Sequence, residues 1–156
     1  MTRPVIHIVL WEPEIAGNVG TLMRFAACCT VVVHIVEPMG FVWSDRHFRR
    51  AHMDYGDTTP CIRHSSWSHY MDSRRTHQDQ GRTIATVPGA GSVYTQFAFQ
   101  PHDALIVGRE SVGLPSAIID QCDHSVHIPM AAGARSLNMA IATAIVASEA
   151  IRQLTV

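Results

Sequence analysis

The chain has 156 residues, 47% of them hydrophobic, and a formal net charge of −1. This length predicts one domain spanning residues 1–156, with a core that needs no disulfide or metal to fold. All 12 basic residues are arginine. The absence of lysine excludes a Walker-type phosphate loop, a Schiff-base enzyme and a Ser-x-x-Lys hydrolase. The near-zero net charge argues against a general polyanion binder.

Short apolar runs alternate with helical patterns along the chain. Several runs are rich in β-branched residues and lack polar alternation, as is typical of parallel strands covered on both faces. The predicted strands are residues 5–10, 31–36, 83–87, 105–107 and 126–128. The predicted helices are residues 18–29, 44–50, 65–74, 116–121 and 136–154, the last starting at a capping Ser136. This order predicts an α/β fold with a mainly parallel sheet and helices on both faces.

The last predicted helix, residues 136–154, is apolar over most of its circumference. We therefore expect it to be buried in the core or against a second copy of the chain, and we predict a homodimer. The four cysteines have no regular spacing, which predicts buried, reduced thiols in a cytoplasmic protein. No stretch approaches the roughly 18 apolar residues of a membrane span, so we expect no membrane association.

Three glycine-containing loops follow three predicted strands in the second half of the chain. Their sequences are PGAG at residues 88–91, GRESVGLP at 108–115 and PMAAGARS at 129–136. In open α/β sheets ligands bind beyond the carboxyl ends of the strands, and glycines allow close approach of the backbone. This pattern favours a nucleotide-like cofactor. The first strand–helix turn, WEPEIAGNVG, lacks the Rossmann fingerprint.

Two other kinds of site have weaker patterns. Cys122, His124 and His127 could hold zinc, but no fourth ligand has suitable spacing, so we expect no metal. No G-x-S-x-G elbow is present, which argues against a hydrolase.

Arginines are concentrated in one quarter of the chain. This quarter contains only four acidic residues. Its seven arginines are Arg46, Arg49, Arg50, Arg63, Arg74, Arg75 and Arg82. They are either a solvated surface with ion pairs or a set of bidentate phosphate contacts.

Three segments, NVGTLMR, LIVGRESVGLP and IPMAAGARSLNMAIA, resemble the signature segments of the SPOUT RNA methyltransferases. Three more, EPEIAGNVG, HIVEPMGFVWSD and FRRAHMDYGD, are similar to the subfamily that methylates the ribose 2′-hydroxyl of the tRNA wobble nucleotide. The resemblance spans nearly the whole chain. It implies a C-terminal deep trefoil knot, a homodimer, and a ribose 2′-O-methyltransferase that uses S-adenosylmethionine and releases S-adenosylhomocysteine.

Carried over by position, the resemblance also implies individual roles. The cofactor contacts would be Thr86, Gly108, Ile128, Met130, Ser136 and Leu137, mostly through main-chain atoms. Arg24 would be catalytic. Because arginine is a poor general base, we expect it to hold the substrate phosphate and stabilise the developing alkoxide. Glu14 and Asn18 would shape the substrate pocket, and the predicted helix carrying Arg46, Arg49 and Arg50 would bind tRNA phosphates.

The chain departs from the subfamily pattern at a few positions. Ala140 and Ile141 replace a usual serine and asparagine, Ser148 replaces a tyrosine, and Thr86 replaces a leucine. These departures leave two alternatives open. One is the same chemistry on ribosomal RNA or another tRNA position, and the other is a non-catalytic RNA-binding dimer.

Overall fold

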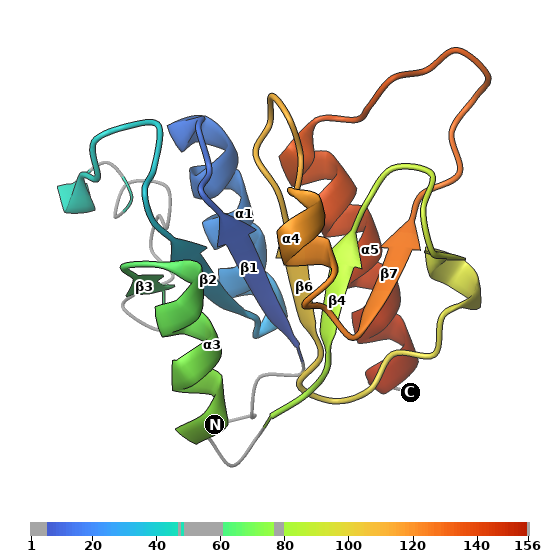
Figure 1. Cartoon of the computed structure of the whole chain (residues 1–156), viewed down its shortest axis with the longest axis horizontal. Coiled ribbons are helices and arrows are strands. Elements are labelled where there is room, and N and C mark those ends of the chain that lie inside the picture. Colours follow the sequence, from blue (N-terminus) through green and yellow to red (C-terminus); the bar gives the residue numbers. More distant parts are fainter. Residues whose placement is uncertain (1–5, 47, 49–60, 77–79, 156) are drawn as a thin grey trace.

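The computed structural model describes residues 6–46, 48, 61–76 and 80–155. In this part of the chain the strands form one seven-stranded sheet of order β3-β2-β1-β6-β4-β7-β5, in which every pairing is parallel. The strands are β1 (His7–Trp11), β2 (Val32–Val36), β3 (Cys61–His64), β4 (Thr83–Thr86), β5 (Ser92–Val93), β6 (Ala104–Val107) and β7 (His124–His127). The prediction of a mainly parallel α/β sheet is confirmed (Figure 1).

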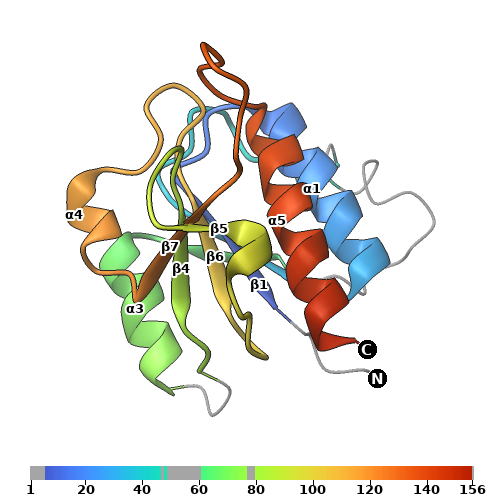
Figure 2. The same cartoon turned by 90° about the vertical axis from the view of Figure 1, so that its right-hand side faces the viewer.

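Helices cover both faces of this sheet, as predicted. They are α1 (Ala16–Cys29), α3 (Trp67–Thr76), α4 (Ser116–Ile119) and α5 (Met139–Leu154), with a 3-10 turn η2 (Tyr94–Gln96). Figure 2 shows α1 and α5 on one face and α3 and α4 on the other. The two helix starts on the first face, those of α1 and α5, lie at the edge of the sheet where the central strands end (Figure 1).

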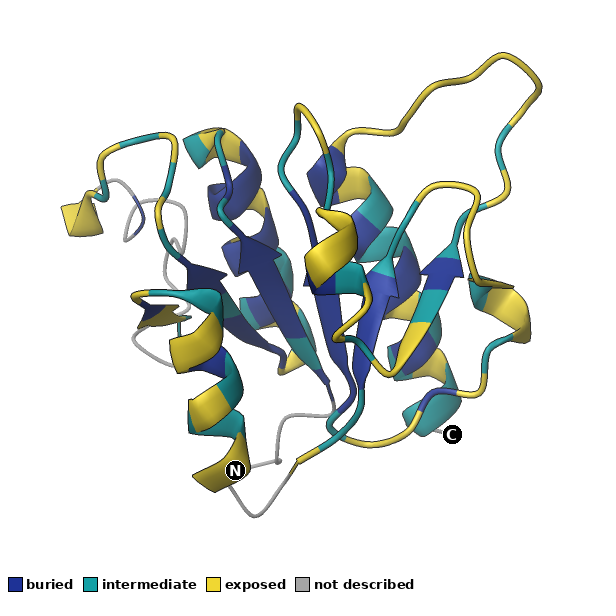
Figure 3. Cartoon of the chain, viewed as in Figure 1, coloured by how far each residue is buried: buried dark blue, intermediate teal, exposed yellow. Residues whose placement is uncertain are grey.

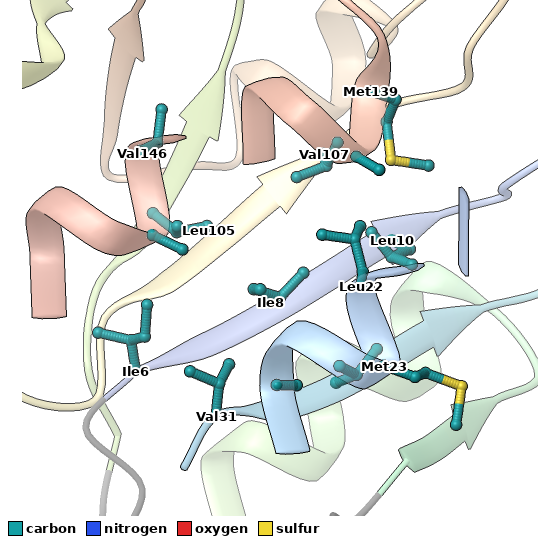
Figure 4. Packing of buried hydrophobic residues seen from close by; sticks show 14 of the residues in the cluster. Ile6, Ile8, Leu10, Leu22, Met23, Val31, Leu105, Val107, Met139 and Val146 are labelled. Atoms are coloured by element: carbon teal, nitrogen blue, oxygen red, sulfur yellow. The ribbon is translucent and has the colours of Figure 1, made fainter. Parts of the chain in front are cut away.

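The residues of the central strands alternate between two apolar clusters. Ile8 and Leu10 of β1 pack with Leu22 of α1 and Val146 of α5, as Figure 4 shows. Their neighbour Val9 faces the other cluster, beneath α3 and α4. Both faces of β1 are therefore buried (Figure 3). This burial explains why the run has no polar alternation, and it fixes the orientation of α1 and α5 against the sheet.

Two strands were missing from the prediction. β3 is an edge strand paired with β2 in the register Val33↔Cys61, and its Ile62 and Arg63 are exposed. It therefore lacks the apolar run of a buried strand. β5 has only two residues. Of the predicted helix at residues 44–50, Asp45, Arg46 and Phe48 are helical, and its other members 47, 49 and 50 lie outside the described residues.

The predicted start of the last helix at Ser136 is wrong. The helix starts at Met139, because the side chain of Asn138 accepts hydrogen bonds from the backbone N–H groups of Ala140 and Ile141. α5 has apolar residues on two faces, of which only one packs against the sheet. Val146, Ala147 and Ala150 are buried against the sheet, and Ile141 on the other face is 55% exposed.

The four cysteines are free thiols, as predicted, but they are not all buried. Cys28 is exposed, and Cys29, Cys61 and Cys122 are half-buried. Burial raises the pKa of the Cys61 thiol to about 12 and that of the Cys122 thiol to about 11. These two thiols stay protonated at neutral pH and are poor nucleophiles. No helix in the described part of the chain is long and apolar enough to cross a membrane.

Candidate active site

A cleft of about 590 Å³ opens at the carboxyl ends of β6, β4 and β7, three neighbours in the sheet. Its walls are the loops that follow these strands, completed by the starts of α1 and α5. Figure 1 shows the three loops side by side at this edge, although they come from separate parts of the sequence. The volume lies within the range of about 300–1,000 Å³ that is common for small-molecule sites.

The six residues predicted to contact a cofactor come together in this cleft. Thr86, Gly108, Ile128, Met130, Ser136 and Leu137 all line it. Thr86 also donates a hydrogen bond from Oγ1 to the carbonyl of Ile106, at 3.0 Å, so its hydroxyl serves to join β4 to β6. The remaining lining combines apolar residues, among them Val87, Val107 and Val126, with polar and charged ones such as Glu110 and Arg135. The placement agrees with the expected roles, which stay a prediction.

The loop at residues 108–113 is closed so tightly that it requires glycine at both ends. Arg109 N donates to the Gly113 carbonyl at 3.2 Å, and Gly113 N donates to the Arg109 carbonyl at 2.9 Å. A Cβ atom on Gly108 would overlap the backbone of Gly113 and Leu114. Gly113 has φ +69°, in the left-handed region that favours glycine. The loop is therefore held in one tight conformation where it borders the cleft.

A relay of side-chain hydrogen bonds connects the starts of α5 and α1 at the cleft. Asn138, the N-cap of α5, donates from Nδ2 to Oδ1 of Asn18 at 3.1 Å. Asn18 is 8% exposed and donates in turn from Nδ2 to Oε1 of Glu110 at 3.2 Å. Asn18 was predicted to shape a substrate pocket. The structure places it in the cleft lining, where it joins two helix starts to the loop after β6.

Glu14 lies beside the cleft rather than in its lining. Its carboxylate accepts hydrogen bonds from Ser111, at 2.7 Å from Oγ and 3.1 Å from the backbone N. Sequence reasoning singled out neither Ser111 nor Glu110, although both occur in the quoted segment GRESVGLP. The polar side chains of Glu110 and Ser111, shortly after Gly108, could have indicated a functional loop. Their partners could not be predicted, because these lie more than 90 residues away in the chain.

Neither the predicted catalytic Arg24 nor Arg46 of the predicted RNA-binding set lines the cleft. Arg24 on α1 is exposed, as is Arg46. Arg49 and Arg50 lie outside the described residues. Arg74 and Arg82 are at the opposite, amino-terminal edge of the sheet, and both are held internally: Arg74 donates to the Tyr70 hydroxyl and Arg82 pairs with buried Asp103. These last two arginines are therefore poor candidates for phosphate contacts.

Among the described residues, no three His, Cys, Asp or Glu side chains cluster as a metal site would require. Cys122, His124 and His127 are all described, so the zinc alternative has no geometric support.

Comparison with known proteins gives consistent matches over the whole fold. The model of the SpoU rRNA Methylase family matches residues 5–148. A tRNA (cytidine(34)-2′-O)-methyltransferase of Ancylobacter novellus is 44% identical over 95% of this chain and 92% of its own length. A solved structure concerned with 2-OH methylation of cytidine or uridine 34 on tRNA is 33% identical with a TM-score of 0.86, covering 96% of both chains.

A second solved structure includes the cofactor. The SpoU methyltransferase AviRb from Streptomyces viridochromogenes, in complex with AdoMet, is 27% identical to this chain with a TM-score of 0.85. The match covers 98% of this chain and 59% of AviRb.

The tight loop at Gly108 makes a testable prediction about the cleft. Gly108→Ala should weaken S-adenosylhomocysteine binding by about tenfold or more, because the added Cβ must push the 108–113 loop out of place. Isothermal titration calorimetry measures the change. Gly17→Ala is the matched control, since a Cβ at Gly17 on α1 meets no atom within 4 Å. Equal affinities for the two variants would show that the loop does not form the cofactor site.

Proposed function

The chain belongs to the SpoU rRNA methylase family, and we propose on that basis that it transfers a methyl group from S-adenosylmethionine to a tRNA ribose 2′-hydroxyl. The acceptor is the wobble nucleotide, cytidine or uridine 34. The observation that carries this assignment is the 44% identity, over nearly the full length of both chains, to a tRNA (cytidine(34)-2′-O)-methyltransferase. The cleft at the carboxyl ends of β6, β4 and β7 supplies a site of suitable size.

The cleft residues suit the cofactor that the family uses. S-adenosylmethionine supplies an electrophilic methyl group on a sulfonium. Ile128, Met130 and Leu137 offer apolar contact, and the 108–113 loop offers backbone groups to polar edges of the ligand. Thr86, Gly108 and Ser136 complete the proposed contacts. The departure at Thr86 is tolerated in this arrangement, since its hydroxyl is satisfied by the Ile106 carbonyl.

Arg24 is the proposed catalytic residue. The attacking ribose oxygen must lose a proton, and arginine, whose pKa exceeds about 12, does not accept one at neutral pH. The guanidinium instead holds the substrate phosphate and stabilises the developing alkoxide, while the proton leaves to that phosphate or to water. The exposed position of Arg24, outside the cleft lining, suits a side chain that faces RNA.

The family also has a characteristic domain organisation and chain threading. We infer that residues 1–156 are one domain and that its C-terminal part is threaded into a deep trefoil knot. Support comes from family membership and from the likeness to solved structures at TM-scores of 0.86 and 0.85. Because its substrate is tRNA, we place the activity in the cytoplasm.

Methylation of purified tRNA tests the function directly. The chain is incubated with labelled S-adenosylmethionine and unmodified total tRNA, and nucleosides and anticodon fragments are analysed by mass spectrometry. We expect 2′-O-methylcytidine or 2′-O-methyluridine at position 34. A methyl group found only in ribosomal RNA or elsewhere in tRNA would change the substrate. S-adenosylhomocysteine binding without any transfer would favour the non-catalytic alternative.

Arg24→Ala should abolish transfer and leave the affinity for S-adenosylhomocysteine within about twofold of the parent value. The reason is that Arg24 lies outside the cleft lining. Single-turnover transfer and calorimetry on the same preparation measure both quantities. A large loss of cofactor affinity would place Arg24 on the cofactor side of the site.

Arginines near residue 46 should carry part of the affinity for tRNA. Neutralising Arg49 and Arg50 together should reduce the log–log salt slope of tRNA binding by about one to two, because each phosphate contact releases counterions. The melting temperature should stay nearly constant. Arg75→Ala removes an exposed arginine that pairs with Asp72 on α3, and it should leave the slope unchanged if the phosphate contacts lie at Arg49 and Arg50. An unchanged slope with a lowered melting temperature would mean that Arg49 and Arg50 are structural.

We also propose a homodimer that packs the outer face of α5 against its mate, with an active site shared between subunits. Ile141, Ala144 and Ile145 form a shallow, mostly apolar hollow with Tyr94 of η2 on this face. Light scattering at micromolar concentration should give twice the monomer mass. Ile141→Arg should shift the chain to monomer, and Ser68→Arg on exposed α3 should not. A monomeric parent protein would contradict the proposal.

A further inference from the structure

Two carboxylates cross between the loops that flank the cleft. Glu14, in the connection from β1 to α1, accepts hydrogen bonds from the hydroxyl and the backbone N–H of Ser111. Glu110, in the loop after β6, accepts the backbone N–H groups of Glu14 at 2.8 Å and Ile15 at 3.1 Å. Each loop therefore binds the backbone of the other through its own carboxylate. We call these four residues the carboxylate clasp.

The donors that meet Glu110 have a fixed direction. Asn138 Oδ1 accepts the N–H groups of Ala140 and Ile141, so its Nδ2 must be the atom that faces Asn18. Oδ1 of Asn18 accepts that bond, which leaves its Nδ2 to face Glu110. Turning either amide would lose a hydrogen bond to the start of α5 or to its neighbour. Glu110 therefore meets three N–H donors and must present acceptors to all of them.

A third link joins the same two loops next to the clasp. Arg109 forms an ion pair with Glu12, and its guanidinium carbon lies 5.0 Å from the centre of the Trp11 ring. Glu12 has φ +48°, in the left-handed region that is uncommon for residues other than glycine. Several contacts thus hold this connection in one conformation.

We propose, on the basis of the proposed function, that Glu110 and Glu14 are positioning residues for methyl transfer. They hold the first turn of α1 at a fixed distance from the 108–113 loop. Because α1 carries Arg24 and the loop lines the cofactor cleft, the clasp sets the alignment between methyl acceptor and methyl donor. Such alignment contributes to rate even when no positioning residue touches a reacting atom.

The carboxylates of Glu110 and Glu14 differ in whether a glutamine can replace them. Glutamine at position 110 has one acceptor oxygen, and its NH₂ would face a backbone N–H or the amide of Asn18. Glutamine at position 14 can accept from Ser111 N and donate to Ser111 Oγ, because a hydroxyl both donates and accepts. The geometry therefore predicts opposite results for two chemically identical substitutions.

The experiment measures kcat, KM for tRNA, the affinity for S-adenosylhomocysteine, and amide hydrogen exchange. Glu110→Gln should lower kcat by about tenfold or more, with KM for tRNA within about threefold. Exchange of the Glu14 and Ile15 amides should speed up, since their acceptor is impaired. Glu14→Ala should also lower kcat, and Glu14→Gln should recover most of that loss. Asp72→Asn on α3 is the control for removing a carboxylate.

A double-mutant cycle tests whether Glu14 acts through Ser111. Ser111→Ala combined with Glu14→Ala should lower kcat no further than Glu14→Ala alone, because both changes break the same contact. Ser111 is exposed and Glu14 is half-buried, so we expect their variants to fold. They therefore test the proposal even if the Glu110→Gln variant does not fold.

Three results would overturn the proposal. Equal losses for the glutamine variants at 14 and 110 would show that negative charge, not hydrogen-bond geometry, matters. A rise in KM for tRNA at constant kcat would make Glu14 a substrate contact. A lower melting temperature with parental kcat would leave the clasp a purely structural feature. If the parent chain transfers no methyl group to tRNA, the proposed function fails, and amide exchange and cofactor affinity still decide whether the clasp holds the loops.

Discussion

The start of α1 has backbone N–H groups that its own sequence does not satisfy. The residue at the N-cap is Ile15, whose side chain cannot accept a hydrogen bond. The N–H groups of Glu14 and of Ile15 itself donate to the carboxylate of Glu110, which lies 95 residues beyond Ile15 in the chain. Because a negative charge is also favoured at a helix N-terminus, this contact draws the loop after β6 onto α1.

The order of strands makes that contact possible. β1 lies between β2 and β6, in the parallel register His7↔Ala104, so the loops that follow β1 and β6 leave the sheet side by side. α1 and α5 then pack on the same face, with both of their N-terminal ends at the edge where the central strands end (Figures 1 and 2). Residues of both helix starts line the cleft. Asn18 and Asn138, one from each helix, complete the contact to Glu110. The apolar packing of α1 and α5 on one face of the sheet thus brings these three polar side chains together beside the cleft.

The sequence predicts the parts of this arrangement that depend on local pattern. β1, β2 and β6 are apolar runs because both of their faces are buried, and the cofactor cleft is predicted by glycines that follow strands. Ser136 and Asn138 are both good capping residues, and local pattern alone does not distinguish them. In the structure Asn138 accepts the N–H groups of Ala140 and Ile141 and also contacts Asn18, 120 residues away. β3 was missed because edge position lets Ile62 and Arg63 face solvent. The partners of Glu110 and Ser111 could not be predicted either, since no spacing pattern connects residues so far apart. The proposed role of Arg24 comes from the family resemblance alone, since an exposed arginine on an amphipathic helix has no distinguishing local signal.

The cleft is assembled by contacts between residues that are 92 to 120 positions apart. Such contacts have a high sequence separation, and closing long loops is slow. No fragment of the chain that lacks α1 or α5 contains a complete ligand site. A ligand in this cleft therefore binds the fully folded chain and stabilises it against global unfolding, by about 2.7 kcal/mol at a hundred times its Kd. Occupancy of the cleft and the free energy of unfolding are thus linked through the same loops.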